Sequence, residues 1–172
     1  NDLTSLYNKI NSSNKTIVDF LKENGLNENE ITVNAPEIVD MNAERYSSNQ
    51  SNYRYNVTQV ITVASSKVDL VRRLINEQSE LLKQGIAITG GDYMYRVKYE
   101  YSDLNSIKPQ MIEEATKNAR TAAQKFASDS DSKLGKIKRA SQGQFSISDR
   151  DEFTPYIKKV RVVTTIDYFL ED

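Results

Sequence analysis

Apolar residues recur every three or four positions in three stretches of the chain, a spacing that places them on one face of a helix. The sequence therefore predicts helices over residues 3–24, 65–85 and 109–127. Asp2 and either Ser65 or Ser66 are suited to N-cap the first two helices, and Gly25 and Gly85 are suited to end them. Pro109 fits the first turn of the third helix, whose apolar face consists largely of alanine.

Other stretches alternate apolar and polar residues, as half-buried strands do. They predict strands over residues 31–41, 53–63, 93–101, 135–147 and 156–170. The alternation is strictest over 93–101, where Tyr93, Tyr95, Val97, Tyr99 and Tyr101 share one face. Such a strand has one face packed against the protein and one face exposed to solvent, which is typical of antiparallel or mixed sheets.

The element order α-β-β-α-β-α-β-β predicts an α+β fold, with a mixed or antiparallel sheet packed with helices. The length of 172 residues fits a single domain over 1–172. An α-β-β stretch at each end of the chain leaves open a division into two α-β-β-like halves, 1–64 and 65–172.

The amino-acid composition excludes several kinds of catalytic and metal-binding sites. The chain has no histidine and no cysteine, which excludes a Ser-His-Asp triad, a cysteine nucleophile, a disulfide and the usual zinc and iron–sulfur sites. Its 23 basic and 24 acidic residues give a net charge of −1, so no global charge points to nucleic acid. No apolar run approaches the roughly 20 residues that a transmembrane helix needs.

The acidic residues offer little for catalysis or metal binding. The pairs Glu113/Glu114 and Asp151/Glu152 are neighbours in sequence, on a predicted helix turn and in a predicted turn, and do not face one another. Asp129-Ser130-Asp131 begins like a calcium loop, but Lys133 and Leu134 replace a ligand and the turn glycine. Gly90-Gly91 lacks the context of a phosphate-binding loop. We therefore expect no enzymatic activity, no metal and no cofactor.

The tyrosines Tyr93, Tyr95, Tyr99 and Tyr101 form the most distinctive candidate contact surface. Tyrosine combines a large apolar ring with a polar tip and is common at interfaces. The plainer interpretation is that these rings pack beneath the helices, since aromatic residues are ordinary strand residues.

A second, weaker candidate is a basic patch on the last two predicted strands. Its residues are Lys136, Lys138, Arg139, Lys158, Lys159 and Arg161, which a hairpin could bring together. A phosphate or nucleic-acid site would use such a patch, but no aromatic stacking motif accompanies it. A solvated sheet face that discourages edge pairing is the plainer interpretation, and we expect no nucleic-acid partner.

Several segments in a fixed order resemble the SIMPL domain, a bacterial family that includes periplasmic immunogenic proteins. These are Tyr53-Arg54-Tyr55, the helix opening Lys67-Val68-Asp69-Leu70 and its end at Gly85, the alanine-rich helix over 115–127, Leu134-Gly135-Lys136-Ile137 and the closing strand over 160–168. The resemblance extends from about residue 21 to the C-terminus. It implies export to the periplasm or cell envelope, assembly into large ring-like oligomers in some members, and links to stress tolerance or to signalling proteins. It implies no established enzymatic activity.

The family usually begins with one or more strands ahead of its first helix, whereas this chain opens inside that helix. We therefore expect an N-terminal strand and an export signal ahead of residue 1, and an unpaired sheet edge without them. The leading hypothesis is a non-enzymatic envelope protein that acts as a homo-oligomer or with an envelope protein partner. The alternatives are a module that binds a small ligand or peptide through the tyrosines or a strand edge, and a histidine-free enzyme using carboxylates.

Overall fold

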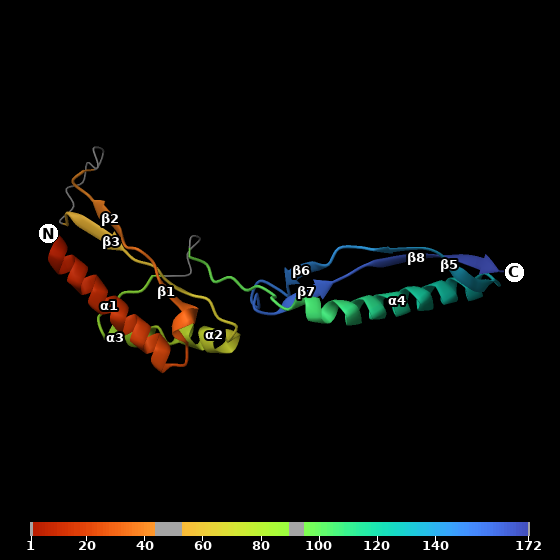
Figure 1. Cartoon of the computed structure of the whole chain (residues 1–172), viewed down its shortest axis with the longest axis horizontal. Coiled ribbons are helices and arrows are strands. Elements are labelled where there is room, and N and C mark those ends of the chain that lie inside the picture. The colour runs from red at the N-terminus through yellow and green to blue at the C-terminus, as the bar shows by residue number, and fades with distance from the viewer. Residues whose placement is uncertain (1, 44–52, 90–94, 172) are drawn as a thin grey trace. The chain divides into compact units, whose positions relative to one another are not determined.

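The computed structural model describes residues 2–43, 53–89 and 95–171 (Figure 1). The chain divides into two compact units, Asn1–Tyr95 and Arg96–Asp172, and each is described by itself. Residues 44–52 and 90–94, which include Gly90-Gly91 and Tyr93, lie outside the described residues. The structure confirms the α+β class, since the described part of each unit contains antiparallel strands and at least one α-helix.

The first unit opens with α1, Leu3–Glu23, whose two ends match the sequence prediction. The Asp2 carboxylate accepts hydrogen bonds from the backbone N–H groups of Thr4 and Ser5, at 3.1 and 3.2 Å. At the other end Gly25 adopts a φ of +104°, and the backbone N–H groups that follow the helix turn back onto its last carbonyls. Glycine alone takes this backbone angle without strain.

A long antiparallel hairpin follows α1 and a short 3₁₀ turn, η1, at Glu28–Glu30. Strand β1, Ile31–Val33, pairs with β4, Ile61–Val63, and β2, Glu37–Asp40, pairs with β3, Tyr55–Thr58. Each predicted strand is thus present but divided in two. Pro36 lies at the first division, because it has no N–H to donate to the ladder.

The predicted helix 65–85 is two helices, α2 at Val68–Asn76 and α3 at Ser79–Lys83. They are separated where the N–H of Glu77 is shared between the carbonyls of Arg73 and Leu74, which tightens the last turn of α2. The predicted side-chain cap is also absent, because the N-cap is Lys67 and it makes no capping bond. The hydroxyl of Ser65 instead accepts from the Lys67 N–H and donates to Glu30.

Buried apolar side chains in the first unit are few. Leu26, Leu74, Leu81 and Ile86 are each at most 9% exposed. Leu26 and Ile86 directly follow Gly25 and Gly85, the glycines with positive φ that end α1 and α3. The turns after the two helices therefore also deliver side chains to the core.

The second unit contains α4, Leu104–Asp129, which begins five residues earlier than predicted. Pro109 consequently lies inside the helix, and Glu113 and Glu114 lie beyond its first turn. The prediction overlooked that Leu104 and Ile107 extend the apolar stripe towards the N-terminus. The stripe continues along one face through Met111, Ala115, Ala119, Ala123 and Ala127, which are all less exposed than the opposite face.

Helix α4 runs along a second long antiparallel hairpin (Figure 1). Strand β5, Lys133–Gln142, pairs with β8, Thr164–Glu171, and β6, Ser146–Asp149, pairs with β7, Lys158–Arg161. The predicted acidic turn lies at the closed end, between β6 and β7. In this register β8 is regular, whereas β5 has irregularities between Leu134 and Ile137 and between Ile137 and Arg139.

These irregularities explain why β5 does not alternate. Leu134 lies opposite Leu170, Ile137 opposite Tyr168 and Ala140 opposite Ile166, so a spacing of three on β5 matches a spacing of two on β8. Each shift adds one residue to β5, as a β-bulge does.

The predicted strand at 93–101 is not a strand in its described part. Residues 95–101 form no ladder with another described strand. Alternation shows only that a segment can present one apolar and one polar face, while a strand also needs a neighbour to hydrogen-bond. No such neighbour lies beside this segment within the described chain.

Candidate functional site

The tyrosines of the described segment are neither buried beneath a helix nor gathered in a pocket. Tyr95 is 39% exposed and Val97 is 49% exposed, while Tyr99 and Tyr101 are half-buried. The Tyr99 ring meets the ring of Tyr156 edge to face, with centroids 6.0 Å apart and an interplanar angle of 64°. Tyr99 is therefore held at the turn that closes the second hairpin.

The basic residues lie in two groups far apart along the second hairpin. Lys136, Lys138 and Arg139 are on β5, and Lys158, Lys159 and Arg161 are on β7. Because the hairpin is antiparallel, the starts of β5 and β7 lie at opposite ends of it. Arg161 pairs with Ser146, seven residues along from Arg139, which corresponds to roughly 23 Å of strand. The hairpin does not form one patch from the six residues.

Several of these basic residues also lie beside an acidic residue or an aromatic ring. Lys158 pairs with Asp149, and Arg139 lies opposite Asp167. The Lys138 ammonium lies 5.8 Å from the centre of the Phe169 ring, within cation–π range. Lys136 and Lys138 flank Ile137 at the two irregularities of β5, where charged side chains and bulges oppose further strand pairing.

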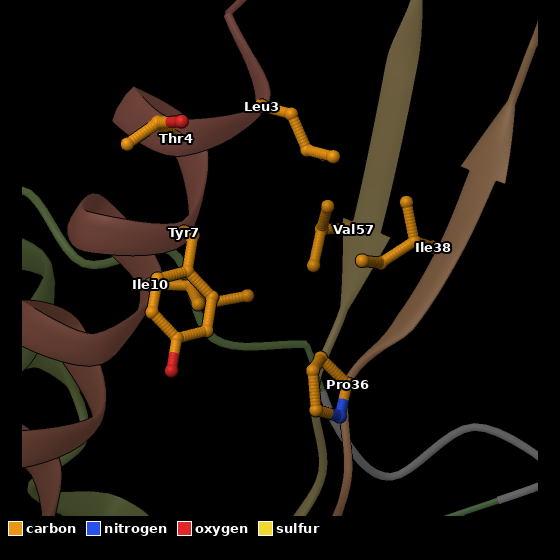
Figure 2. Close-up of a pocket in the computed structure, with 7 residues that line it drawn as sticks. All are labelled: Leu3, Thr4, Tyr7, Ile10, Pro36, Ile38 and Val57. Atoms are coloured by element: carbon orange, nitrogen blue, oxygen red, sulfur yellow. The ribbon is translucent and has the colours of Figure 1, made fainter.

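A groove of about 260 Å³ lies between α1 and the β2/β3 hairpin of the first unit. Figure 2 shows Leu3 and Tyr7 of α1 on one side of this groove, with Ile38 and Val57 on the strands across from them. Ile10, Thr4 and Pro36 complete its lining. The helical spacing of Leu3, Tyr7 and Ile10 predicted an apolar face, but no sequence signal indicated that the strands would leave this face partly open.

A larger groove, of about 490 Å³, lies between α4 and the β7/β8 side of the second hairpin. Met111, Glu114, Ala115, Asn118 and Ala119 line it from the helix, and residues 160–164 line it from the strands. The alanines leave space for the groove beside the helix, because their side chains end at Cβ. The sequence placed these alanines on the apolar face of the helix but did not predict a groove.

In each of the two candidate acidic pairs, one carboxylate has a lowered pKa. A hydrogen bond from Lys117 lowers the pKa of Glu113 below its ordinary value. Hydrogen bonds from Thr154 and Arg150 lower the pKa of Asp151 to about 2. A general acid working near neutral pH needs a raised pKa instead. Within residues 2–43, 53–89 and 95–171, no three acidic side chains gather as a metal site.

A cluster around Glu30 was not foreseen from the sequence. Its carboxylate accepts from the Asn27 backbone N–H, the Ser65 hydroxyl and the Lys67 ammonium, at 2.8, 2.5 and 2.9 Å. These contacts lower the pKa of Glu30 to about 2, with the backbone bond as the largest cause. The Lys67 ammonium also donates to the carbonyl of Gly25. The cluster joins the end of α1, η1 and the start of α2, and we assign it a structural role.

Comparisons with known proteins place the chain in a family. A search of curated proteins gives no match for it. No helix in the described part of the chain is long and apolar enough to cross a membrane. The profile of one family, described as "SIMPL: Protein of unknown function (DUF541)", matches residues 1–163 of the 172. The chain therefore belongs to the SIMPL family.

Proposed function

We propose that this protein is a non-enzymatic, exported envelope protein that acts through self-assembly or through contacts with other proteins. One observation carries the proposal. Among the described residues, only five hydrophobic side chains are buried, whereas sixteen large ones are at least 37% exposed. Phe126 on α4 and Phe169 on β8 are 76% and 52% exposed. Exposed apolar side chains mark surfaces that other proteins cover where they gather in one patch, and this is the surface that the proposal assigns to contacts.

The remaining parts of the proposal rest on composition and on the family resemblance. The chain lacks histidine and cysteine, and the lowered pKa values of Glu113 and Asp151 do not suit acid catalysis. Export to the envelope and a role in stress tolerance are what the resemblance implies. A chain without thiols also needs no disulfides in an oxidising compartment.

Light scattering on the mature protein over a wide concentration range tests self-assembly. We expect an oligomer that Phe126→Ser weakens and Gln124→Ser leaves unchanged, because both residues are exposed on α4 but only Phe126 is apolar. Capture from envelope extracts tests contacts with other proteins. A strict monomer at high concentration that also recovers no partner would contradict the proposal.

The groove between α1 and β2/β3 favours a second candidate function, the binding of a small apolar ligand or peptide. Its lining is mostly apolar, and its volume of about 260 Å³ is close to the lower end for ligand sites, roughly 300 Å³. An apolar fluorescent probe, N-phenyl-1-naphthylamine, tests it. Binding that Tyr7→Ser abolishes and Lys9→Ser preserves would support this candidate, and binding unaffected by Tyr7→Ser would exclude the groove.

A further inference from the structure

We propose that residues Val97–Tyr101 of one copy add as a third strand to the β7/β8 edge of a second copy, over the groove beside α4. The inference rests on the proposed self-assembly and names the surface that would carry it. It brings together two features of the described part of the second unit, a segment with a strand pattern that joins no described ladder and a strand edge with no described neighbour.

The segment has the properties of a strand that lacks its partner. Val97, Tyr99 and Tyr101 alternate with Lys98 and Glu100, so one face is apolar and the other charged. Within the described chain, the backbone groups of Val97–Tyr101 form no hydrogen bond with another backbone group. Strand addition would satisfy them, because main-chain bonds to a sheet edge supply affinity and alternate side chains supply specificity.

The two edges of the second hairpin differ in how well each could pair with an added strand. The outer edge of β5 is interrupted by two irregularities flanked by Lys136 and Lys138, features that block edge pairing. Strand β8 has a regular register from Thr164 to Glu171 and pairs with β5 alone among the described strands, and the β7/β8 side is interrupted only at Val162 and Val163, which lie between the two strands. The β7/β8 side also borders the groove of about 490 Å³ lined by residues 160–164 and α4. That groove offers room for side chains of an added strand.

The side chains select one arrangement. On the β7/β8 side, the less exposed residues are Val160, Val162, Thr164 and Ile166. The apolar face of the added segment must lie on the same face of the sheet as these residues. An antiparallel strand with Tyr101 opposite Val162 and Tyr99 opposite Thr164 does this and brings both rings to the groove. Lys98 then lies opposite Thr165. The parallel arrangement with the same Lys98–Thr165 pair would set Glu100 opposite Asp167, and like charges in that position are destabilising.

The position of Tyr99 argues that the strand comes from a second copy. In its own chain Tyr99 contacts Tyr156 in the turn that closes the hairpin. Thr164 lies eight residues further along the chain, roughly 26 Å at strand spacing. The segment also begins one residue after the boundary between the two units. Exchange of an identical element across such a junction is an inexpensive route to an oligomer. The exchange would replace the Tyr99–Tyr156 contact with contacts in the groove.

Disulfide trapping tests the interface, because the chain has no cysteine of its own. Lys98→Cys and Thr165→Cys are made in separate full-length chains, which are unfolded together, refolded and treated with oxidised glutathione. Both positions are exposed and polar, so the substitutions leave the apolar contacts intact. The matched control replaces Thr165→Cys by Ser141→Cys, since Ser141 is the β5 partner of Thr165. In the proposed arrangement Ser141 lies two strand spacings from Lys98, roughly 10 Å.

We expect on the order of ten times more covalent dimer from the 98/165 mixture than from the 98/141 mixture, because a disulfide forms only between closely placed Cβ atoms. A preference for 98/141 would place the segment on the β5 edge and overturn the proposal. No disulfide between the two chains would also overturn it. So would a Lys98→Cys/Thr165→Cys double variant whose disulfide forms only within one chain. Light scattering on the unmodified chain separates the two proposals. An oligomer whose 98/165 mixture forms no disulfide would exclude this interface only. A strict monomer that also recovers no partner would contradict the proposed function as well.

Discussion

Gly135 and Phe169 approach so closely across the β5–β8 ladder that a Cβ on Gly135 would lie 2.9 Å from the carbonyl oxygen of Phe169. The same Cβ would lie 2.9 Å from a carboxylate oxygen of Glu171. The side chain of Glu171 can move, but the carbonyl of Phe169 belongs to the backbone. Glycine at position 135 is therefore required by space.

Gly135→Ala should separate the first residues of β5 from the end of β8. We expect a loss of about 1–3 kcal/mol in the free energy of unfolding, the usual cost of forcing a methyl group into an occupied site. Urea unfolding followed by circular dichroism measures it, and faster amide exchange at Leu170 and Glu171 would locate it. Ser141→Ala, at an exposed position of the same strand, is the control. Equal midpoints for the two variants would show that the backbone gives way at no cost.

Leu81 and Leu82 are adjacent leucines with opposite environments, 2% and 57% exposed. Leu81→Ala leaves a cavity in the core of the first unit, and we expect it to cost about 2–5 kcal/mol. Leu82→Ala should change the free energy of unfolding by no more than about 0.5 kcal/mol. Urea unfolding of both variants makes the comparison. A larger effect at Leu82 would mean that its side chain is covered in the assembled protein.

Glu30 and Glu28 belong to the same 3₁₀ turn but have different partners. The side chain of Glu30 is 12% exposed and accepts hydrogen bonds from three donors. The side chain of Glu28 is 88% exposed and forms one ion pair, with the Lys22 ammonium at 3.4 Å. We expect Glu30→Gln to lower the urea midpoint at pH 7, because it removes the charge that Lys67 and the Asn27 N–H stabilise. Glu28→Gln should leave the midpoint where it is. Equal midpoints in both variants would argue that the Glu30 cluster does not hold η1 and α2 together.

Stability should fall in acid because of Glu30 and Asp151. The folded protein lowers the pKa of Glu30 from 4.5 to about 2 and that of Asp151 from 3.8 to about 2. The unfolded chain therefore binds more protons between these values, so the contribution is complete above about pH 4.5 and disappears as the pH falls through 2. Unfolding measured from pH 6 to pH 2 should show this loss. The double variant Glu30→Gln/Asp151→Asn should show a shallower decline, and an unchanged slope would exclude these two groups as its source.

Features set by neighbours in sequence could be predicted. Asp2, Gly25 and Gly85 act within a turn of their own positions, so the ends of α1 and α3 follow from residue type. Pro109 misled the prediction because proline is tolerated inside α4, where the stripe from Leu104 continues past it. The predicted capping role of Ser65 failed because Glu30, 35 residues earlier in sequence, engages its hydroxyl.

Features set by pairing could not be predicted. The alternation over 95–101 predicted a strand, but these residues form no ladder with another described strand, because the pattern does not say whether a neighbour lies close enough to pair. The sequence suggested that a hairpin could bring the basic residues together, with a solvated sheet face as the plainer interpretation, whereas the antiparallel register places Lys136 and Lys158 at opposite ends of the hairpin. The grooves depend on which side chains are short at a packed surface, and this is visible only in three dimensions.

The two irregularities of β5 have a consequence for changes in chain length. Each inserts one residue into β5 and still leaves Leu134, Ile137 and Ala140 on one side of the sheet, because their partners on β8 are two residues apart. Deleting one residue at either irregularity would restore ordinary alternation there and leave that facing unchanged. Deleting one residue from the regular stretch between Arg139 and Gln142 would instead turn the side chains beyond it to the other face. Related sequences should therefore vary by single residues at the two irregularities and keep a constant length between Arg139 and Gln142.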